Sequence, residues 1–445
     1  MLTFSGARAL MIDQQTVRTG DLHCRDGRVV AHPRAIRQHG ADDQPSGEVV
    51  DVSDCVITPG LVNAHHHLLQ TAFRTLPGTR DVPMATWLPT MAEAYRSVGV
   101  DPELAGAAAA VGIAESLLCG VTTVADHHLT WPRGVGIEGL TDIAVAIAGA
   151  AGVLGARLVF VRGSAGDDPE QAALSAESIV QQLVPSGGGV TGDGMLQVAV
   201  GPAGVHSDGR ATFDALAQVA ARHGLRRRTQ ANEVVDVVIA AQRYGRRPLD
   251  LLDDWGWLAP DVTLAHLCGV TPAEIGLLAE RGVGATHAPG CDLPMGWGVA
   301  PVAALLEAGV TVGLGTSGGG SNDASHLLAD ARLALQIAPA AGRPLAALEV
   351  LGAATAGSAT GLGRHELGHL GVGAAADLCV WDVGGVADAG VADPVAGLLW
   401  AAPGRRPRHV VVGGKWVVRD GALVRGDEHD IARRLTRLLA RRSAV

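Results

Sequence analysis

The segment "ITPGLVNAHHHLLQ", residues 57–70, places three consecutive histidines directly after a short apolar run. The apolar run is typical of a buried strand. His65 and His67 are two residues apart, and side chains with that spacing lie on the same side of an extended strand. Paired imidazoles suit zinc and iron. The segment therefore predicts a strand leading into a metal or catalytic centre, whose other residues must come from elsewhere in the chain.

The overall composition narrows the classes of protein. The chain has 445 residues, 47% of them hydrophobic and 18% charged. That length allows two or three domains, or one large barrel with an appendage. The net charge of −10 argues against a nucleic-acid surface, because phosphate binding needs a basic stripe and the basic run at 222–230 is too short to supply one.

The cysteines and the N-terminal sequence indicate the compartment. The six cysteines contain no C-x-x-C pair, which favours buried thiols and a reducing compartment over a disulfide framework. The first residues have no basic start or sustained apolar segment, so no signal peptide is predicted. No apolar run reaches the roughly 18 residues that a membrane span needs. We expect a cytoplasmic protein without a membrane partner.

Both ends of the chain have the pattern of short strands joined by tight turns. Asp-Gly at 26–27, Gly-Gly at 413–414 and Asp-Gly at 420–421 are hairpin signals between alternating segments. The sequence therefore predicts one β module assembled from residues 1–58 and 365–445.

Between these ends, residues 59–364 alternate apolar, strand-like runs with stretches rich in Ala and Leu. The expected strands are 121–126, 156–163, 195–202, 262–267, 283–289 and 310–316, and the expected helices include 101–120, 210–224, 271–282 and 301–309. Such alternation predicts a parallel sheet, most economically a (β/α)₈ barrel in an α/β protein. Polar residues follow the strands, where a barrel places its active site: His65, His67, Asp126, His206, Glu233, His266, His287 and Ser317.

Several of these segments resemble one family in the same order. The motifs "PGLVNAHHH", "GVTTVADHH", "VTLAH", "THAPGCD", "GLGTSGGGSND" and "GVGAAADLCVWD" are similar to those of the amidohydrolase superfamily. Within it, they most resemble the N-heterocycle deaminases and chlorohydrolases, a branch that includes 8-oxoguanine deaminases and triazine hydrolases. The resemblance covers essentially the whole chain. It implies a distorted (β/α)₈ TIM barrel with a β-sandwich built from both termini.

The resemblance also implies roles for individual residues. In that branch, one Zn²⁺ or Fe²⁺ is held by an H-x-H, a third His and an Asp, while a Glu and a further His handle protons and polarise the substrate. His65 and His67 match the H-x-H, Glu233 and His266 match the proton-handling pair, and His287 follows the next strand.

Two of the metal-ligand positions do not match. Gln230 in "QANE" stands where the branch has the third His, and Ser317 in "GLGTSGGGSND" stands where it has the Asp. A neutral amide or hydroxyl is a poor substitute for imidazole or carboxylate at zinc or iron. The sequence therefore predicts a zinc or iron site of reduced affinity, or no metal at all.

Other residues complete the predicted site. Trp87 is expected to form a pocket wall on which a flat ring stacks. Asp126 is expected to fix a histidine tautomer, and His127 is a possible replacement for a lost ligand. The expected catalytic residues are thus Glu233, His266 and Ser317; the metal residues are His65 and His67; and the substrate-binding residues are Trp87, Asp126, His127, Gln230 and His287.

Two functions stay open from the sequence. The first is hydrolysis or deamination at a C–N bond of a small, purine-like N-heterocycle. The second is a repurposed relative, either a metal-independent acid–base enzyme of lyase, isomerase or cyclase type, or a ligand-binding pseudoenzyme. In both cases we expect a small heterocyclic ligand and a homo-oligomer, a dimer or larger.

Overall fold

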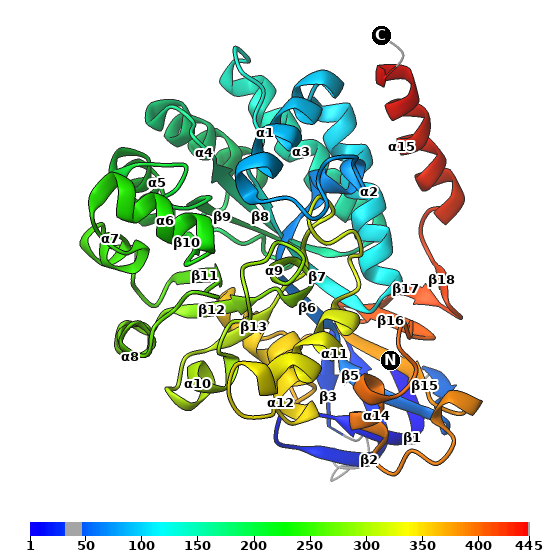
Figure 1. Ribbon diagram of the computed structural model, residues 1–445. Helices are drawn as coiled ribbons and strands as arrows, with labels where there is room; N and C mark the ends of the chain where they lie inside the picture. Colours follow the sequence, from blue (N-terminus) through cyan, green and yellow to red (C-terminus); the bar gives the residue numbers. More distant parts are fainter. Residues whose placement is uncertain (32–46, 444–445) are drawn as a thin grey trace.

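The computed structural model describes residues 1–31 and 47–443 (Figure 1). Its centre is a nine-stranded parallel sheet in the order β13-β12-β11-β10-β9-β8-β7-β6-β14. The strands are β6 (Leu61–His67), β7 (Val121–His128), β8 (Arg157–Ser164), β9 (Leu196–Pro202), β10 (Arg226–Ala231), β11 (Val262–His266), β12 (Gly284–His287), β13 (Val312–Leu314) and β14 (Ser317–Gly318). Because β13 pairs with β12 and the next segment, β14, pairs with β6, the sheet closes into the predicted barrel.

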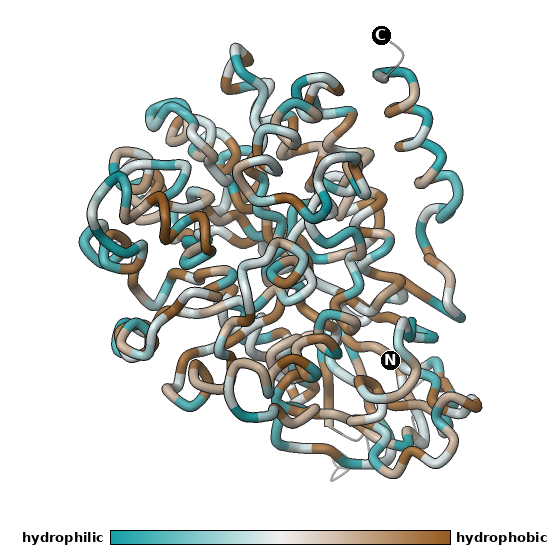
Figure 2. Tube along the Cα trace, in the orientation of Figure 1, coloured by the Kyte–Doolittle hydropathy of each residue, from teal (hydrophilic) through white to brown (hydrophobic). Residues whose placement is uncertain are grey.

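Helices surround the barrel. They are α1 (Met84–Val98), α2 (Pro102–Leu118), α3 (Ile137–Leu154), α4 (Pro169–Leu183), α5 (Arg210–His223), α6 (Val234–Tyr244), α7 (Pro248–Asp254), α8 (Pro272–Arg281), α9 (Pro289–Asp292), α10 (Val302–Glu307), α11 (Leu327–Ile337), α12 (Ala347–Gly352) and α13 (Ser358–Gly361). Their starts follow local chemistry: Asp101 and Asp168 accept hydrogen bonds from the first turns of α2 and α4, each followed by proline. Figure 2, in the same orientation, shows hydrophilic stretches along many of the outer turns of the chain.

Helix α3 is long and apolar enough, by length and composition, to cross a membrane. In the structure it instead packs between α2 and α4 in the outer ring of the barrel. Its buried residues Ile143, Ala144 and Ile147 belong to the main apolar core. The apolar composition of α3 is therefore explained by its packing against the barrel and the neighbouring helices.

Strand β10 was not among the expected strands, because its sequence, "RRRTQA", has the composition of a basic surface run. The structure shows why arginine is tolerated there. Arg226 donates to the carbonyl oxygen of Gly361, and Arg227 forms an ion pair with Asp261. These specific partners replace the apolar packing that a strand in this position ordinarily provides.

The two ends of the chain form a second, mixed sheet beside the barrel (Figure 1). Its strands are β1 (Leu2–Met11), β2 (Val17–Arg25), β3 (Arg28–Val30), β4 (Glu48–Asp51), β5 (Cys55–Pro59), β15 (Leu378–Asp382), β16 (His409–Val412), β17 (Lys415–Arg419) and β18 (Ala422–Leu423). The expected turns are present, with Gly27, Gly414 and Gly421 at positive φ. Apolar residues from both ends, such as Phe4 and Val411, share one core cluster, so the sheet wraps around its own interior.

The remaining elements connect or cover these parts. They are the short helices η2 (Leu68–Phe73), η3 (Ala338–Ala340), η4 (Ala353–Gly357) and η5 (Val386–Asp388), with α14 (Pro394–Trp400) and α15 (Glu428–Ser443). Leu435 and Leu438 of α15 pack in the cluster that contains Leu69 and Phe73, so this C-terminal helix contacts the barrel side of the molecule. The domain limits 1–58 with 365–445, and 59–364, stay a prediction; residues 32–46 lie outside the described residues.

Candidate active site

Four histidine rings meet inside the barrel, near the carboxyl ends of the strands. The centroid of the His65 ring lies 4.8 Å from that of His67, 5.1 Å from that of His266 and 5.9 Å from that of His127. All four side chains are buried. The barrel thus brings together predicted site residues from β6, β7 and β11, which are far apart in the sequence.

Hydrogen bonds to carbonyl oxygens define the tautomers of two of these rings. His67 Nδ1 lies 2.6 Å from the carbonyl oxygen of His127, and His127 Nε2 lies 2.9 Å from that of Gly201. A carbonyl only accepts, so each of these nitrogens carries the proton. Burial, reinforced by neighbouring histidines, lowers the pKa of His67 to about 4 and that of His127 to about 3. His67 Nε2 and His127 Nδ1 are therefore hydrogen-bond acceptors at neutral pH.

His266 is held differently, by a buried carboxylate. Its Nδ1 lies 2.7 Å from Asp292 Oδ1, and Asp292 Oδ2 lies 3.4 Å from His287 Nδ1. Burial alone would lower the pKa of His266, but the Asp292 carboxylate outweighs it and raises that pKa. The same pairing holds the pKa of Asp292 at about 2 against the opposing effect of burial. The Asp292 carboxylate therefore favours the protonated form of His266, in which both ring nitrogens donate.

Asp292 was not predicted as a site residue. The sequence placed it on a loop after His287, and its only signal was a carboxylate five residues beyond a strand-end histidine. The structure puts it in the short helix α9, fully buried. Trp297 was also missed; the centroid of its ring lies 5.0 Å from that of His266.

Gln230 and Glu233 complete the group around His266. Gln230 Oε1 accepts a hydrogen bond from His266 Nε2 at 2.9 Å, while its amide nitrogen donates to the carbonyl oxygen of Ala203 at 3.1 Å. Glu233 Oε1 lies 3.7 Å from His266 Nε2, and Glu233 Oε2 has no hydrogen-bond partner. Burial raises the pKa of Glu233, more than the nearby His266 and His206 lower it. Glu233 is thus a buried carboxyl group beside His266, and its Oε2 has no hydrogen-bond partner within the protein.

Ser317 begins β14, opposite His66 of β6. Its φ of 55° lies in the left-handed region, as do the φ values of Asn232, His266 and Leu267 at the ends of β10 and β11. Non-glycine residues seldom adopt that conformation, and they concentrate where a site requires a particular backbone path. The strain therefore lies at the same rim as the predicted catalytic residues.

Asp126 and Trp87 lie beside the histidine cluster. Asp126 Oδ1 accepts a hydrogen bond from the backbone nitrogen of Leu68 at 2.8 Å, so the carboxylate holds the chain directly after the H-x-H. Burial raises the pKa of Asp126 to about 7. Trp87 of α1 donates from Nε1 to the carbonyl oxygen of Gly320 at 3.1 Å, which places it against the glycine-rich loop after Ser317.

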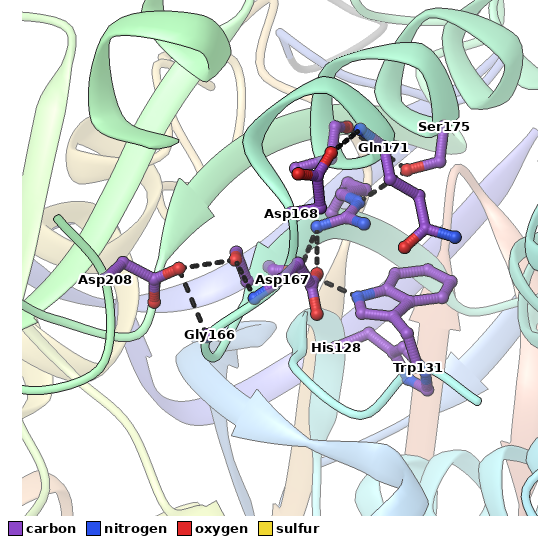
Figure 3. A network of polar contacts seen from close by, with 12 residues as sticks. His128, Trp131, Gly166, Asp167, Asp168, Gln171, Ser175 and Asp208 are labelled. Carbon is purple, nitrogen blue, oxygen red and sulfur yellow. Dashed lines mark hydrogen bonds and ion pairs between the residues drawn. The ribbon is translucent and has the colours of Figure 1, made fainter. Parts of the chain in front are cut away.

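A second polar network supports the rim beyond β8 (Figure 3). The buried Arg162 guanidinium contacts Asp167 and Ser175, and its carbon Cζ lies 4.8 Å from the centroid of the Trp131 ring. Trp131 in turn donates to the carbonyl oxygen of Gly163. Both the face and the nitrogen of this indole have partners within the protein, so Trp131 acts in fixing the loop after β7.

Comparisons with known proteins agree with this fold. The sequence model of the amidohydrolase family matches residues 56–417. The chain is 37% identical to 8-oxoguanine deaminase of Pseudomonas aeruginosa, over 96% of this chain and 95% of that protein. It is 31% identical to isoxanthopterin deaminase of an unknown prokaryotic organism, over 90% and 89%. The crystal structure of atrazine chlorohydrolase from Arthrobacter aurescens TC1, complexed with zinc, superposes with a TM-score of 0.90 at 33% identity and covers 99% of this chain and 100% of that one.

The Asp292–His266 pair can be tested by removing its charge. Asp292→Asn should lower the pKa of His266, because burial then acts without an opposing carboxylate. NMR titration of histidine-labelled protein measures this pKa. The exposed Asp420, 3.8 Å from His409, provides the control, and Asp420→Asn should leave His266 unchanged. An unaltered His266 pKa in Asp292→Asn would show that the carboxylate is not what holds the proton.

The same pair sets a pH window for stability. The pKa of Asp292 is lowered by folding, so its contribution is present above the ordinary Asp value of about 4 and is lost as the pH falls toward about 2. The pKa of His266 is raised, so its contribution is complete below the ordinary His value of about 6.5 and is lost as the pH rises through the folded value. Urea unfolding from pH 2 to 9 should show both losses, and both should shrink in Asp292→Asn.

Proposed function

The chain belongs to the amidohydrolase family, and on that premise we propose that it hydrolyses a C–N bond of a small N-heterocycle, releasing ammonia. The observation that carries this proposal is the buried chain Glu233–His266–Asp292, in which a carboxyl group with a raised pKa lies beside an imidazole that Asp292 holds in place. The relatives support the substrate class, since two of them are named deaminases of a purine and a pterin.

Glu233 is the proposed general acid. A carboxyl whose pKa is raised by burial keeps its proton closer to neutral pH and can pass it to a ring nitrogen or a leaving amine. The free Oε2 is the atom from which that proton would leave. His266, held as an imidazolium by Asp292, stabilises negative charge that develops on the substrate as water adds to the ring carbon.

Water is the proposed nucleophile. Glu233 gives its proton to the adjacent ring nitrogen as the water adds to the carbon that bears the amino group, and it takes a proton back from that water. It then protonates the amino group; as the C–N bond breaks and ammonia leaves, the proton of the new hydroxyl returns to Glu233 and the ring carbon becomes a carbonyl. His67 Nε2 and His127 Nδ1, the two acceptor nitrogens, can orient the hydrogens of that water. The low pKa of both rings limits them to orienting the water.

We further propose that zinc or iron contributes little in this chain. A catalytic zinc site needs about three strong protein ligands. His65 and His67 fit, and His65 Nε2 is a buried atom without a partner. Gln230, in contrast, has both ends of its amide engaged by His266 and Ala203, and Ser317 offers only a hydroxyl. This donor set does not fit the family's metal, and we assign the metal no step.

Glu233→Gln tests the proposed acid. The substitution should lower kcat by roughly 10²–10⁴-fold, the range typical of a general acid or base, while the affinity for the heterocycle changes little. The assay is ammonia release from a panel of aminopurines, aminopterins and aminotriazines. Glu280→Gln, on the exposed side of α8, is the control and should keep full activity. A variant that loses affinity at an unchanged rate would indicate a binding role for Glu233.

The metal proposal is tested by restoring ligands. Gln230→His with Ser317→Asp should raise zinc affinity by orders of magnitude over the wild type, because it adds an imidazole and a negative charge. Aspartate also tolerates the left-handed φ of position 317 better than most residues. Elemental analysis and competition with a chelator measure the affinity. One equivalent of metal that survives chelator dialysis in the wild type would contradict the proposal and indicate a rescuing ligand such as His127, His287 or Glu233.

A further inference from the structure

Arg228 is a buried charge that the proposed reaction does not use. It lies two residues before Gln230 in β10, so both side chains are on the face of the strand that points into the barrel. Its Nη2 donates to the carbonyl oxygen of Ala64, the residue before His65. Its Nε and Nη1 are buried without a hydrogen-bond partner. A buried, partly unsatisfied guanidinium is unfavourable, which indicates that a partner is missing.

The other deeply buried arginines show what such a partner is. Each contacts a carboxylate at 2.7 Å: Arg157 with Asp377, Arg162 with Asp167, and Arg364 with Glu366. Figure 3 shows Asp167 among the contacts that surround one of them. In residues 1–31 and 47–443, Arg228 is the one arginine at this depth without a carboxylate within ion-pair distance. The exception lies directly beside the histidine cluster.

The electrostatics around Arg228 have one sign. The hydrogen bond to Ala64 places the guanidinium beside the residue that precedes His65. After burial and the neighbouring histidines, the charge of Arg228 further lowers the pKa values of His65 and His127. Arg226, two residues earlier, adds a second positive charge; burial first and then Arg226 lower the pKa of Arg228 to about 9. This region therefore opposes a divalent cation and favours an anion.

We propose that Arg228 anchors a pocket for a monoanionic group, of the size of a halide or a carboxylate, next to His65 and His127. The guanidinium offers Nε–H and Nη1–H, two free charged donors on different sides of the group, each of which can hold an anion through a charge-assisted hydrogen bond. If the anion is part of the substrate, the substrate is an acidic N-heterocycle. This alternative rests on the proposed function. Where it is free, the pocket takes a small inorganic or organic anion.

Binding measurements on the whole protein test this inference without any assay of activity. The probes are sodium formate, sodium chloride, and the pair nicotinate and nicotinamide, which are flat rings of the same size that differ in charge. Calorimetry and thermal shift at constant ionic strength should show that the wild type binds an anionic probe and discriminates against nicotinamide. Arg228→Gln should weaken that binding about tenfold or more, as expected for loss of a charged hydrogen bond.

Two further variants control for charge and folding. Arg228→Lys keeps the charge and should retain part of the affinity. Arg227→Gln removes the same charge from the outer face of β10, where Arg227 pairs with Asp261, and should leave anion binding unchanged. If Arg228→Gln does not fold, the preference of the wild type for nicotinate over nicotinamide and the behaviour of Arg228→Lys still decide the question.

Each outcome has a defined meaning. Binding of nicotinate but not formate or chloride would support a substrate-borne anion, and binding of formate or chloride alone would support a free one. Equal binding of nicotinate and nicotinamide, or wild-type affinity in a folded Arg228→Gln, would overturn the inference. If the wild type releases ammonia but binds no anionic probe, the anion site is wrong and the proposed function stands. If the wild type binds an anionic probe but releases no ammonia, the anion site stands and the proposed function is wrong.

Discussion

The buried carboxylate of Asp292 is the interaction on which the arrangement of the site depends. A carboxylate without access to water must be paired, and Asp292 is paired with His266 and His287 at once. This pairing favours the protonated form of His266, whose second nitrogen then donates. Gln230 Oε1 is the acceptor, and the amide nitrogen of Gln230 donates to Ala203, so both ends of this amide are hydrogen-bonded within the protein. The buried charge of Asp292 thus acts on Gln230 through the two nitrogens of the His266 ring.

The barrel explains how the chemistry of such a site can change without a change of fold. Each strand delivers one or two side chains to the same rim, and the helices and the terminal sheet carry the stability. Substitutions at the strand ends therefore alter the chemistry while the framework stays intact. The left-handed residues His266 and Ser317 lie at this rim, where strain is tolerated because the surrounding barrel determines the backbone path.

Much of the fold could be predicted from the sequence, because local patterns determine the strands and helices. Features that depend on contacts between distant residues could not be predicted in this way. Apolar runs such as 121–126 and 262–267 predicted strands β7 and β11 because buried parallel strands are uniformly apolar. Strand β10 was missed because Arg226 and Arg227 have particular distant partners, Gly361 and Asp261, which periodicity does not reveal. The role of Asp292 was missed for the same reason. Three features depend on three-dimensional contacts and could only come from the structure. They are the tautomers of His67 and His127, the buried nitrogens without hydrogen-bond partners, and the absence of a carboxylate beside Arg228.

The central claim is that the buried acid–imidazolium chain, and not a metal ion, performs hydrolysis in this chain. The most direct measurement is ammonia release from the heterocycle that the protein turns over best, with and without an excess of a strong chelator. The account predicts equal rates in both, with a pH profile governed by one carboxyl and one imidazole. An activity that the chelator abolishes and that added Zn²⁺ or Fe²⁺ restores would contradict it.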